Sequence, residues 1–479
     1  MKLHLVLEDM IPGEQREQLF RHVDIHGITA NSSEVRKNDV FVAIPGCQRD
    51  GHDFIHDAIK AGAAVVVGEK DIGELGVPYI KVPNSRLALG KMAGKFYEKP
   101  SNKHKIIGVT GTNGKTTTSF MLKQILEDAG LSCSLIGTVL NEINGQVMPS
   151  THTTPDALKL HKLIFDSKDD VIIIEVSSHG LSQHRVEGVQ FDCCLFTNLD
   201  HEHLDYHRDM EDYFSVKASL FDKLNQDGKA VVNGYNSWGE KLIKLLKHKQ
   251  NSMFILGDSD GYDLRIGQGG RTGTIMLHEG AIQHPLSLKV PGSHNAHNAA
   301  MAFLTARALD VPREDILQSL QRFSGVTGRF EMMKHPSGAT IIIDYAHTAD
   351  AFFHCLKTAR EHGARRVIHV FGFRGGRDES KRRGMVNVSR ELSDLCILTL
   401  DDLNKIPREE MIRTLHELNV PTSGVVIPDR TMAIQFAWEQ AEDGDWIMIT
   451  GKGSEIYQQS YDLPTASDRE TIHYLNAIQ

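Results

Sequence analysis

Short apolar runs alternate with amphipathic stretches along most of the chain. Between them, "TTTSFMLKQILEDAG" spaces its apolar positions as a helix does and ends in glycine. Alternating strands and helices predict an α/β fold, with parallel sheets covered by helices on both faces. The runs that read as strands, each followed by a polar or glycine-rich turn, are "KIIGVTG", "DVIIIEVSS", "CCLFTNLD", "GKAVVNGYN", "ATIIIDYAHT", "RVIHVFGF", "LCILTLDD" and "DWIMITGKG".

Two polar segments marked by proline or glycine interrupt this alternation. They are "YEKPSNK", near residues 98–103, and "SGVTGRFE", at 324–331. A chain of 479 residues is too long for one core. We therefore predict three domains, at residues 1–100, 101–327 and 328–479.

Composition narrows the class of protein. The formal charge of −9 offers no basic excess for nucleic acid, so no nucleic-acid partner is expected. The start of the chain does not read as a signal peptide, and runs such as "AAVVV" are too short to cross a membrane. The cysteines form no CxxC pair, which favours reduced thiols in the cytoplasm. They are Cys47, Cys133, Cys193, Cys194, Cys355 and Cys396.

Polar residues gather just after the apolar runs. Ligands of open parallel sheets bind beyond the carboxyl ends of the strands, so these positions are candidates for a site. Turns are polar in any protein, but the repetition across five strands favours a functional interpretation. The residues are Glu175, Asn198, Asp200, Asp344, His347, Asp401 and Lys452.

The segment "GVTGTNGKTTTS", residues 108–119, is a variant phosphate-binding loop. Val109 stands where the common pattern has its first glycine, and Gly111 lies inside the loop. The segment still joins a predicted strand to a predicted helix, so amide groups and Lys115 would face a triphosphate. Thr116 is placed to coordinate Mg²⁺. Downstream, "TNLDHEHLDYH" gathers histidines and carboxylates behind a strand, which is typical of a metal site.

Taken together, these motifs resemble the Mur ligases, and most closely the branch that adds the third residue to the peptidoglycan precursor. The resemblance runs in order across residues 31–455. It rests on "GTNGKTT", "EVSSHGLSQHRV", "TNLDHEHLDYH", "YFSVKASLF", "GSHNAHNAA", "GRFE", "DYAHTAD" and "GKGSE".

The resemblance implies three domains: one for uridine, a central P-loop ATPase and a Rossmann-like lid that binds the amino acid. It implies a reaction in which ATP phosphorylates a carboxylate and an amine then attacks the acyl phosphate. The implied catalytic residues are Lys115, Glu175, His203 and Lys217. Of these, Glu175 and His203 join Thr116 as Mg²⁺ ligands, and Lys217 joins them as a CO₂-derived carbamate. Taken alone, the segment around Lys217 would predict only an exposed lysine on a helix.

The same resemblance assigns the substrate contacts. For ATP they are Gly111, Thr112, Asn113, Gly114, Lys115, Thr116, Thr117, His294, Asn295, Asn298, Arg329 and Asp344. For the nucleotide sugar they are Ser32, Thr153, Thr154, Ser177, Gln183 and Arg185. The chain departs from the family at residues 31–33, which read Asn-Ser-Ser where the family has Asp-Ser-Arg. The implied partners are a nucleotide-sugar peptide and a free amino acid, with no membrane and a monomeric protein.

The implied amino-acid pocket contains Arg377, Asp401, Asn404, Gly453 and Glu455. Diaminopimelate-adding members carry Asp-Asn-Pro-Arg where this chain has "DDLN", so the arginine that pairs with the distal carboxylate is missing. We expect meso-diaminopimelate to be a poor substrate, with the aspartates favouring L-lysine or L-ornithine. The rival expectation is that Arg374 or Arg408 restores carboxylate binding.

Four other readings compete. A paralogue could join a different amine and carboxylate. A folylpolyglutamate-type ligase would lack the uridine-binding domain. A catalytically inactive relative would only bind a nucleotide sugar, and the intact Lys115, Glu175, His203 and Lys217 weigh against it. A P-loop GTPase or kinase would not share the three-domain layout, and no guanine-reading motif is visible.

Overall fold

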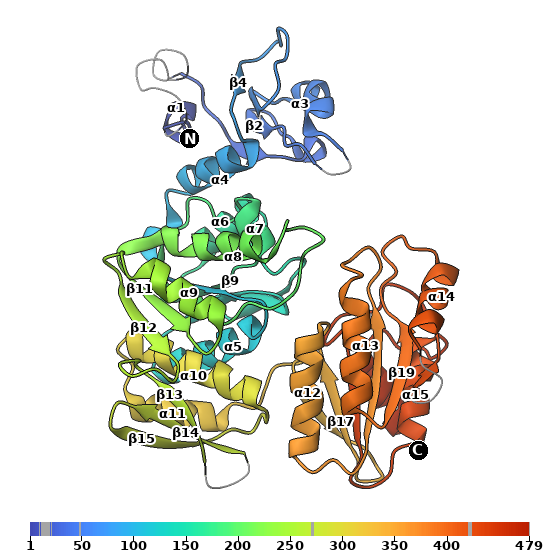
Figure 1. The fold of residues 1–479 in the computed structure, drawn as a ribbon. Coiled ribbons are helices and arrows are strands. Elements are labelled where there is room, and N and C mark those ends of the chain that lie inside the picture. The colour runs from blue at the N-terminus through green and yellow to red at the C-terminus, as the bar shows by residue number, and fades with distance from the viewer. Residues whose placement is uncertain are drawn as a thin grey trace. The chain divides into compact units, whose positions relative to one another are not determined.

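The structure is a computed structural model (Figure 1). It describes residues 1–8, 10, 20, 22–46, 49–269, 273–419 and 424–478, so Cys47 lies outside the described residues. The other five cysteines are buried. In this part of the chain, no helix combines the length and the apolar character of a membrane-spanning segment.

The described chain divides into two compact units. The first comprises residues 1–110, 131–194 and 216–230, and the second comprises 111–130, 195–215 and 231–479. This division passes through the predicted central domain. The domain boundaries at 100 and 327 therefore stay a prediction.

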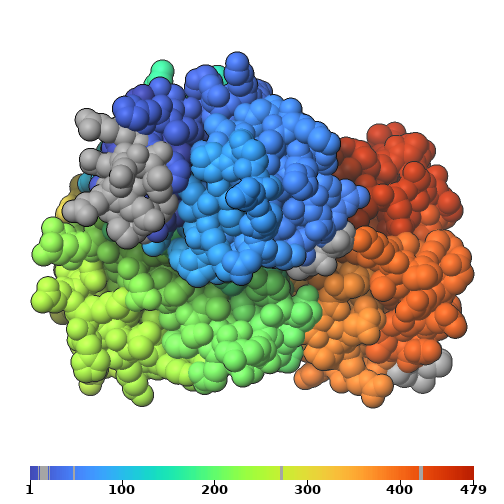
Figure 2. All heavy atoms as spheres, turned by 90° about the horizontal axis from the view of Figure 1, so that it is seen from above, coloured from blue at the N-terminus to red at the C-terminus, as the bar shows by residue number. Residues whose placement is uncertain are grey.

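The N-terminal region holds a four-stranded parallel sheet of order β1-β2-β3-β4. Val40, Val42, Val65 and Val67 point into one core with helix α4, and this region is coloured blue in Figure 2. The elements are α1 (Leu3–Val6), β1 (Gly27–Thr29), η1 (Ser32–Glu34), β2 (Asp39–Val42), η2 (Gly51–Phe54), α3 (Ile55–Ala61), β3 (Val65–Gly68), β4 (Tyr79–Lys81), α4 (Ser85–Phe96) and η3 (Pro100–Lys103).

An eight-stranded sheet follows, with the order β12-β11-β10-β5-β9-β6-β7-β8. Strand β9 pairs in parallel with β5 and β6, while β6, β7 and β8 pair antiparallel, so the prediction of an all-parallel sheet is wrong at this edge. The strands are β5 (Lys105–Thr110), β6 (Cys133–Ile136), β7 (Leu140–Ile143), β8 (Gln146–Pro149), β9 (Val171–Glu175), β10 (Phe191–Phe196), β11 (Leu224–Asn233) and β12 (Ser252–Leu256).

Helices and a small antiparallel sheet complete the middle of the chain. The sheet has the order β13-β14-β15, and α10 packs against α5. The elements are α5 (Lys115–Asp128), α6 (Ala157–Asp166), α7 (Ser178–Ser182), α8 (Met210–Ala218), η4 (Ser219–Lys223), α9 (Ser237–Leu246), β13 (Arg265–Gln268), β14 (Thr274–Glu279), β15 (Ile282–Ser287), α10 (Ser293–Ala308) and α11 (Arg313–Arg322).

The C-terminal region is a six-stranded sheet of order β16-β17-β21-β18-β19-β20, parallel except for β16. Alternate residues of β18 face opposite ways: Ile368 and Val370 pack toward α15 and α16, while Phe371 packs on Phe352 of α12. The elements are β16 (Glu331–Lys334), β17 (Thr340–Asp344), α12 (Ala349–Glu361), β18 (Val367–Phe373), α13 (Lys381–Leu392), β19 (Leu395–Leu400), α14 (Arg408–Leu418), β20 (Gly424–Val426), α15 (Arg430–Glu439), β21 (Trp446–Thr450) and α16 (Asp468–Ala477).

Candidate functional site

The glycine loop joins β5 to α5, as the sequence predicts. Two of its amide groups bond to the segment after β10: Thr112 N to Asn198 O at 3.0 Å, and Asn113 N to Asn198 Oδ1 at 2.8 Å. The Lys115 ammonium donates to the carbonyl oxygens of Gly111 and Thr112, both at 2.8 Å. The loop is therefore held in shape by protein contacts, and its lysine lies over it where a triphosphate would need positive charge.

Close packing explains why this variant of the loop keeps its two glycines. Gly111 and Gly114 have positive φ angles of 146° and 82°. A Cβ atom on Gly111 would lie 1.9 Å from Thr197 Oγ1, and one on Gly114 would lie 2.2 Å from Asn298 Oδ1. Both the backbone angle and the space therefore exclude a side chain at these positions.

Helix α10 brings the predicted ATP-binding residues Asn295 and Asn298 to the loop. Asn298 Nδ2 donates to Asn295 Oδ1 at 3.4 Å, and Asn298 Oδ1 accepts from Thr118 Oγ1 at 3.4 Å. Burial lowers the pKa of His294 on the same helix to about 3, so this histidine is neutral near pH 7. Its buried Nδ1 has no hydrogen-bond partner among the described residues, so it is a polar atom that a bound nucleotide could satisfy.

Arg329, predicted to close over ATP, reaches the loop. Its Nη2 donates to Thr116 Oγ1 at 3.3 Å, and its guanidinium lies 4.2 Å from the centre of the Tyr345 ring. The predicted contact of Asp344 with ATP stays a prediction, and the structure shows which backbone groups this carboxylate binds. It accepts bonds from the amides of Phe330 and Ala346, both at 2.6 Å, and so fixes the two turns that carry Arg329 and Tyr345.

Asp200 lies in a pair of carboxylates bridged by one amide. Asn113 Nδ2 is 3.2 Å from Asp200 Oδ2 and 3.4 Å from Asp350 Oδ2. Burial, followed by repulsion from Asp350, raises the pKa of Asp200 to about 6. The folded protein therefore holds this proton more tightly than the unfolded chain, and stability falls as pH rises from 3.8 to about 6.

We expect Asp200→Asn to stabilise the protein without nucleotide. The gain should be small near pH 4 and reach roughly 1–3 kcal/mol above pH 6, because the amide keeps the acceptor but cannot ionise. Urea unfolding of the parent and the variant across this pH range measures it. Asp443→Asn, at an exposed turn, is the control. A gain that does not change with pH would contradict the assigned cause.

The sequence predicts a metal site in the histidine-rich segment "TNLDHEHLDYH" but does not single out Glu202 within it. This glutamate is buried, 2.5 Å from His347 Nε2 and 3.6 Å from His203 Nε2. Burial raises its pKa, but the two histidines outweigh burial and lower that pKa well below its usual range. His203 has a positive φ of 60°. Only the packing of the segment distinguishes Glu202 from the neighbouring acids, so the sequence held no signal for it.

Glu175 ends β9 and is completely buried. It accepts two bonds from Thr138, from the amide at 3.1 Å and from the hydroxyl at 2.8 Å. The same hydroxyl oxygen lies 3.1 Å from Thr153 Oγ1 and can accept a bond from the Thr153 hydroxyl. Glu175 is therefore a buried, hydrogen-bonded carboxylate, and Thr138 connects it to Thr153, a residue predicted to bind the substrate.

The predicted nucleotide-sugar contacts form a connected group. Thr154 Oγ1 donates to the Glu175 carbonyl at 2.9 Å and accepts from the amide of Ser177, also at 2.9 Å. Arg185 Nη1 donates to the Thr154 carbonyl at 2.7 Å, while its Nη2 bonds to Gln183 Oε1 at 2.8 Å. Residues far apart in sequence are thus assembled around the end of β9, and their binding of the nucleotide sugar stays a prediction.

Ser32 stands apart from this group. It lies in η1, where Asn31 Oδ1 accepts bonds from the amide and the hydroxyl of Ser33. No described contact links Ser32 to the group around Glu175. The uridine contact therefore stays a prediction.

Lys217 lies in α8 and is 1% exposed, which rules out the reading of an exposed helix lysine. Among the described residues, no three histidine, cysteine or acidic side chains gather in a metal-binding arrangement. The predicted Mg²⁺ ligands are not a cluster of this type, because they include the Thr116 hydroxyl and a modified lysine. A buried lysine and a buried glutamate fit such a set, and the set itself stays a prediction.

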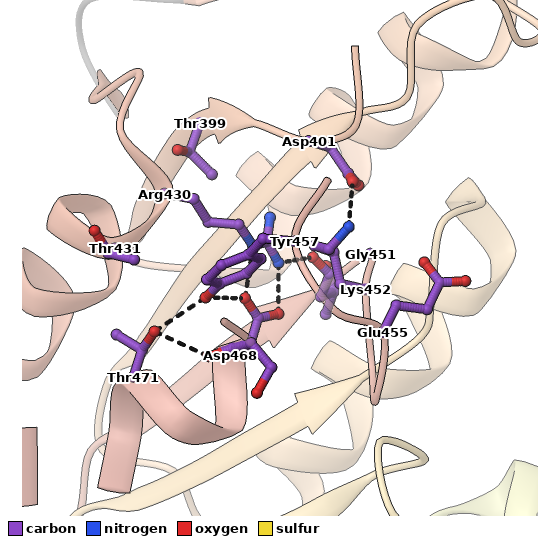
Figure 3. Close-up of polar contacts among 12 residues, drawn as sticks. Thr399, Asp401, Arg430, Thr431, Gly451, Lys452, Glu455, Tyr457, Asp468 and Thr471 are labelled. Carbon is purple, nitrogen blue, oxygen red and sulfur yellow. Dashed lines mark hydrogen bonds and ion pairs between the residues drawn. The ribbon is translucent and has the colours of Figure 1, made fainter. Parts of the chain in front are cut away.

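The predicted amino-acid pocket lies beyond the carboxyl ends of β18, β19 and β21 (Figure 3). Lys452 Nζ is 2.6 Å from Asp402 Oδ1 and 3.5 Å from Asp401 Oδ1, and all three residues are buried. Burial raises the pKa of Asp401, but Arg430, Arg374 and Lys452 outweigh it and lower that pKa. The aspartates are therefore already paired with cations, and the expectation that they offer free negative charge is wrong.

The remaining pocket residues vary in placement. Asn404 is exposed, and its Nδ2 donates to the Gly375 carbonyl at 3.2 Å. Arg377 is exposed as well. Gly453 has a positive φ of 55°, and a Cβ there would lie 2.6 Å from the Gly328 carbonyl oxygen. Glu455 pairs with Arg374, which the sequence singles out as new.

Comparisons with known proteins match most of the chain. Residues 24–97 match the Mur ligase family catalytic domain, 109–306 the Mur ligase middle domain, and 328–453 the glutamate ligase domain of Mur ligases. A curated protein of Clostridium tetani, named UDP-N-acetylmuramoyl-L-alanyl-D-glutamate--2,6-diaminopimelate ligase, is 37% identical over 461 residues. The match covers 94% of this chain and 93% of that protein.

The chain belongs to the Mur ligase family.

Further relatives agree. An Aquifex aeolicus protein of the same name is 37% identical, over 91% of this chain and 90% of that protein. A solved structure with that ligase name has a TM-score of 0.69 and 25% identity, and the match covers 100% of this chain and 99% of that one. A Thermotoga maritima MurF ligase solved with ADP has a TM-score of 0.65 at 20% identity, over 89% and 93% of the two chains, and shows the fold alone.

Membership confirms the predicted fold class, an α/β protein with the three-domain Mur ligase architecture, and an ATP-dependent ligase. It also answers two of the competing readings. A GTPase or kinase is excluded. The folylpolyglutamate synthase of Mycobacterium tuberculosis shares the fold, with a TM-score of 0.62 at 17% identity, but the match covers 76% of this chain. A Mur ligase therefore accounts for more of the chain.

Proposed function

We propose that this Mur ligase adds an amino acid to UDP-N-acetylmuramoyl-L-alanyl-D-glutamate during peptidoglycan-precursor synthesis. The observation that carries the proposal is the 37% identity, over nearly the whole length, to proteins named for that substrate. The assembled group of Thr153, Thr154, Ser177, Gln183 and Arg185 supports it, since a large nucleotide-sugar peptide needs several polar contacts.

The proposed reaction brings a carboxylate against a triphosphate, so positive charge must offset their repulsion. Lys115 and Arg329 supply it at the glycine loop, and Arg185 supplies it beside the substrate-binding group. Mg²⁺, which would be held by Thr116, Glu175, His203 and carbamylated Lys217, would neutralise phosphate charge. The carboxylate oxygen takes the γ-phosphoryl group of ATP and ADP is released. The incoming amine then attacks the acyl carbon, forms the amide bond and releases phosphate and a proton.

Three further features belong to this proposal. The domains are residues 1–100 for uridine, 101–327 for ATP and 328–479 for the amino acid, the last acting as a lid that excludes water from the acyl phosphate. The enzyme works in the cytoplasm and as a monomer. Light scattering after size-exclusion chromatography tests the monomer, and a stable dimer would contradict it.

The proposed function is tested by ADP release with UDP-N-acetylmuramoyl-L-alanyl-D-glutamate and a panel of amino acids and other amines. We expect ADP release to depend on both the nucleotide sugar and one amino acid of the panel. ADP release with no member of the panel would contradict the proposal. It would favour the alternative of a paralogue that joins a different amine and carboxylate. The unusual "DDLN" loop is the sequence feature that supports this alternative.

We expect Glu175→Gln to lower the rate roughly 10- to 100-fold and to raise the Mg²⁺ concentration needed for half-maximal rate. The amide keeps the bond from Thr138 but loses the charge that a cation would neutralise. Mg²⁺ titrations of the parent, Glu175→Gln and His203→Ala measure this effect. Glu187→Gln, a glutamate paired with Lys223, is the control. A slower variant with the parent's Mg²⁺ dependence would show that the residue does not act through the metal.

A further inference from the structure

Arg374 follows the last residue of β18, at the edge of the sheet where Asp401 follows β19 and Lys452 and Glu455 follow β21. Ligands of such sheets bind at this edge. The neighbouring loop at 401–404 offers no arginine, because Asn404 stands there and is exposed. Arg374 is largely buried, with 18% of its side chain exposed.

The Arg374 guanidinium has an edge formed by Nε and Nη2, and only Nη2 of these two nitrogens has hydrogen-bond partners in the structure. Nη1 donates to the Tyr345 hydroxyl at 3.3 Å, and Nη2 donates to Glu455 and to the Gly451 carbonyl. The buried Nε has no hydrogen-bond partner among the described residues, since Asp401 Oδ1 lies 3.9 Å away. A buried donor without an acceptor is costly, so this edge is suited to a ligand.

A second arginine, Arg430 at the start of helix α15, shows how a carboxylate binds the edge of a guanidinium formed by Nε and Nη2. Arg430 donates from Nε and from Nη2 to the two carboxylate oxygens of Asp468, both at 2.7 Å (Figure 3). This is the bidentate geometry that guanidinium groups favour. Arg374 presents the same pair of nitrogens, but Glu455 meets only one of them.

We propose that Arg374 is the specificity residue for the incoming amino acid, binding one of its carboxylates through Nε and Nη2 while Glu455 turns to an ammonium of the same molecule. The inference rests on the proposed function. An arginine and a glutamate in contact match the two charges of an amino-acid head group, so the ion pair between them is exchanged for two ion pairs to the ligand.

The head group held there is not the one that reacts. An amine paired with a carboxylate stays protonated, and an ammonium has no lone pair with which to attack an acyl phosphate. The substrate therefore carries a second amino-acid head group at its far end, which makes it a diamino diacid. L-Lysine would offer an ammonium to Glu455 and nothing to Arg374.

The test compares two substrates that differ by one carboxylate. meso-Diaminopimelate and L-lysine are assayed with the parent and with Arg374→Gln. We expect the parent to prefer the diacid and Arg374→Gln to lower kcat/KM for the diacid roughly 30-fold or more. The KM for ATP and kcat/KM for lysine should change little, because neither needs the lost guanidinium. Arg374→Lys should recover only part of the activity, since an ammonium cannot form the fork.

Two further arginines serve as comparisons. Arg365, just before the opposite end of β18, pairs with Asp445, and Arg365→Gln should leave both substrates unaffected. Arg408→Gln could lower kcat/KM for the diacid alone while Arg374→Gln leaves it unchanged. That result would overturn the inference and assign the role to Arg408. A parent that prefers lysine would also overturn it while leaving the proposed function intact. Inactivity with every amino acid would instead contradict the proposed function. If Arg374→Gln does not fold, the parent's preference and Arg374→Lys decide.

Discussion

Replacing Lys217 with alanine is expected to remove nearly all ligase activity. The side chain is 1% exposed, and an ammonium so deeply buried loses the hydration that stabilises its charge. The neutral amine of a lysine is the form that reacts with CO₂. In the proposed modification the amine would form a carbamate and release a proton, which would turn a cationic side chain into an anionic one. An anion at this position suits a site that must hold Mg²⁺ beside a triphosphate.

We expect Lys217→Ala to lower kcat by roughly 10²- to 10³-fold, the size of effect seen when a group that stabilises transition-state charge is removed. Short carboxylates such as acetate should restore part of the activity, because they can fill the space of the carbamate and carry its charge. Labelling with ¹³CO₂ gives an independent measurement: a carbamate carbon signal in the parent that is absent from the variant.

Lys223→Ala is the matched control for this experiment. Lys223 lies six positions further along and pairs with Glu187 at 2.7 Å, outside the proposed metal set. Its loss should leave both the rate and the ¹³C signal unchanged. Full activity of Lys217→Ala would refute the role of the lysine. A slow variant with no carbamate signal in the parent and no rescue would show a packing role instead.

The sequence predicts those parts of the molecule that depend on local pattern. The strands β5, β9, β10, β17, β18, β19 and β21 follow the apolar runs that predicted them. The helix α5 begins at Lys115, where the loop motif ends. The antiparallel edge formed by β6, β7 and β8 was not predicted, because the direction of a strand depends on its connections and not on its own residues.

The side-chain ion pairs at the edges of the sheets could not be predicted from the sequence. The "DDLN" loop reads as two uncompensated acids, yet Lys452, fifty positions later, pairs with both. Glu202 reads as one acid among several, yet it is held between His203 and His347. Such pairs are set by tertiary packing, so the residue types can be predicted from a motif while their charge balance cannot.

Removing the charge of Lys115 is the second change with a large expected effect. We expect Lys115→Met to lower kcat roughly 10²- to 10³-fold, because methionine keeps the apolar stem and loses the cation beside the phosphates. The ammonium also donates to the carbonyl oxygens of Gly111 and Thr112, so it shapes the loop as well as neutralising its ligand. Calorimetric titration with ATP and thermal unfolding without ATP separate these two roles.

The two roles predict different results. If charge dominates, Lys115→Met binds ATP weakly and melts near the parent's temperature, since a partly buried ammonium with two neutral acceptors contributes little net stability. If loop shape dominates, the melting temperature falls together with binding. Lys123→Ala, two turns along α5 and paired with Glu127, should change neither quantity. Unaltered kcat and ATP affinity in Lys115→Met would mean that the loop does not bind the triphosphate through this lysine. The variant spacing of the glycines in the loop would then indicate that the loop binds a ligand other than a triphosphate.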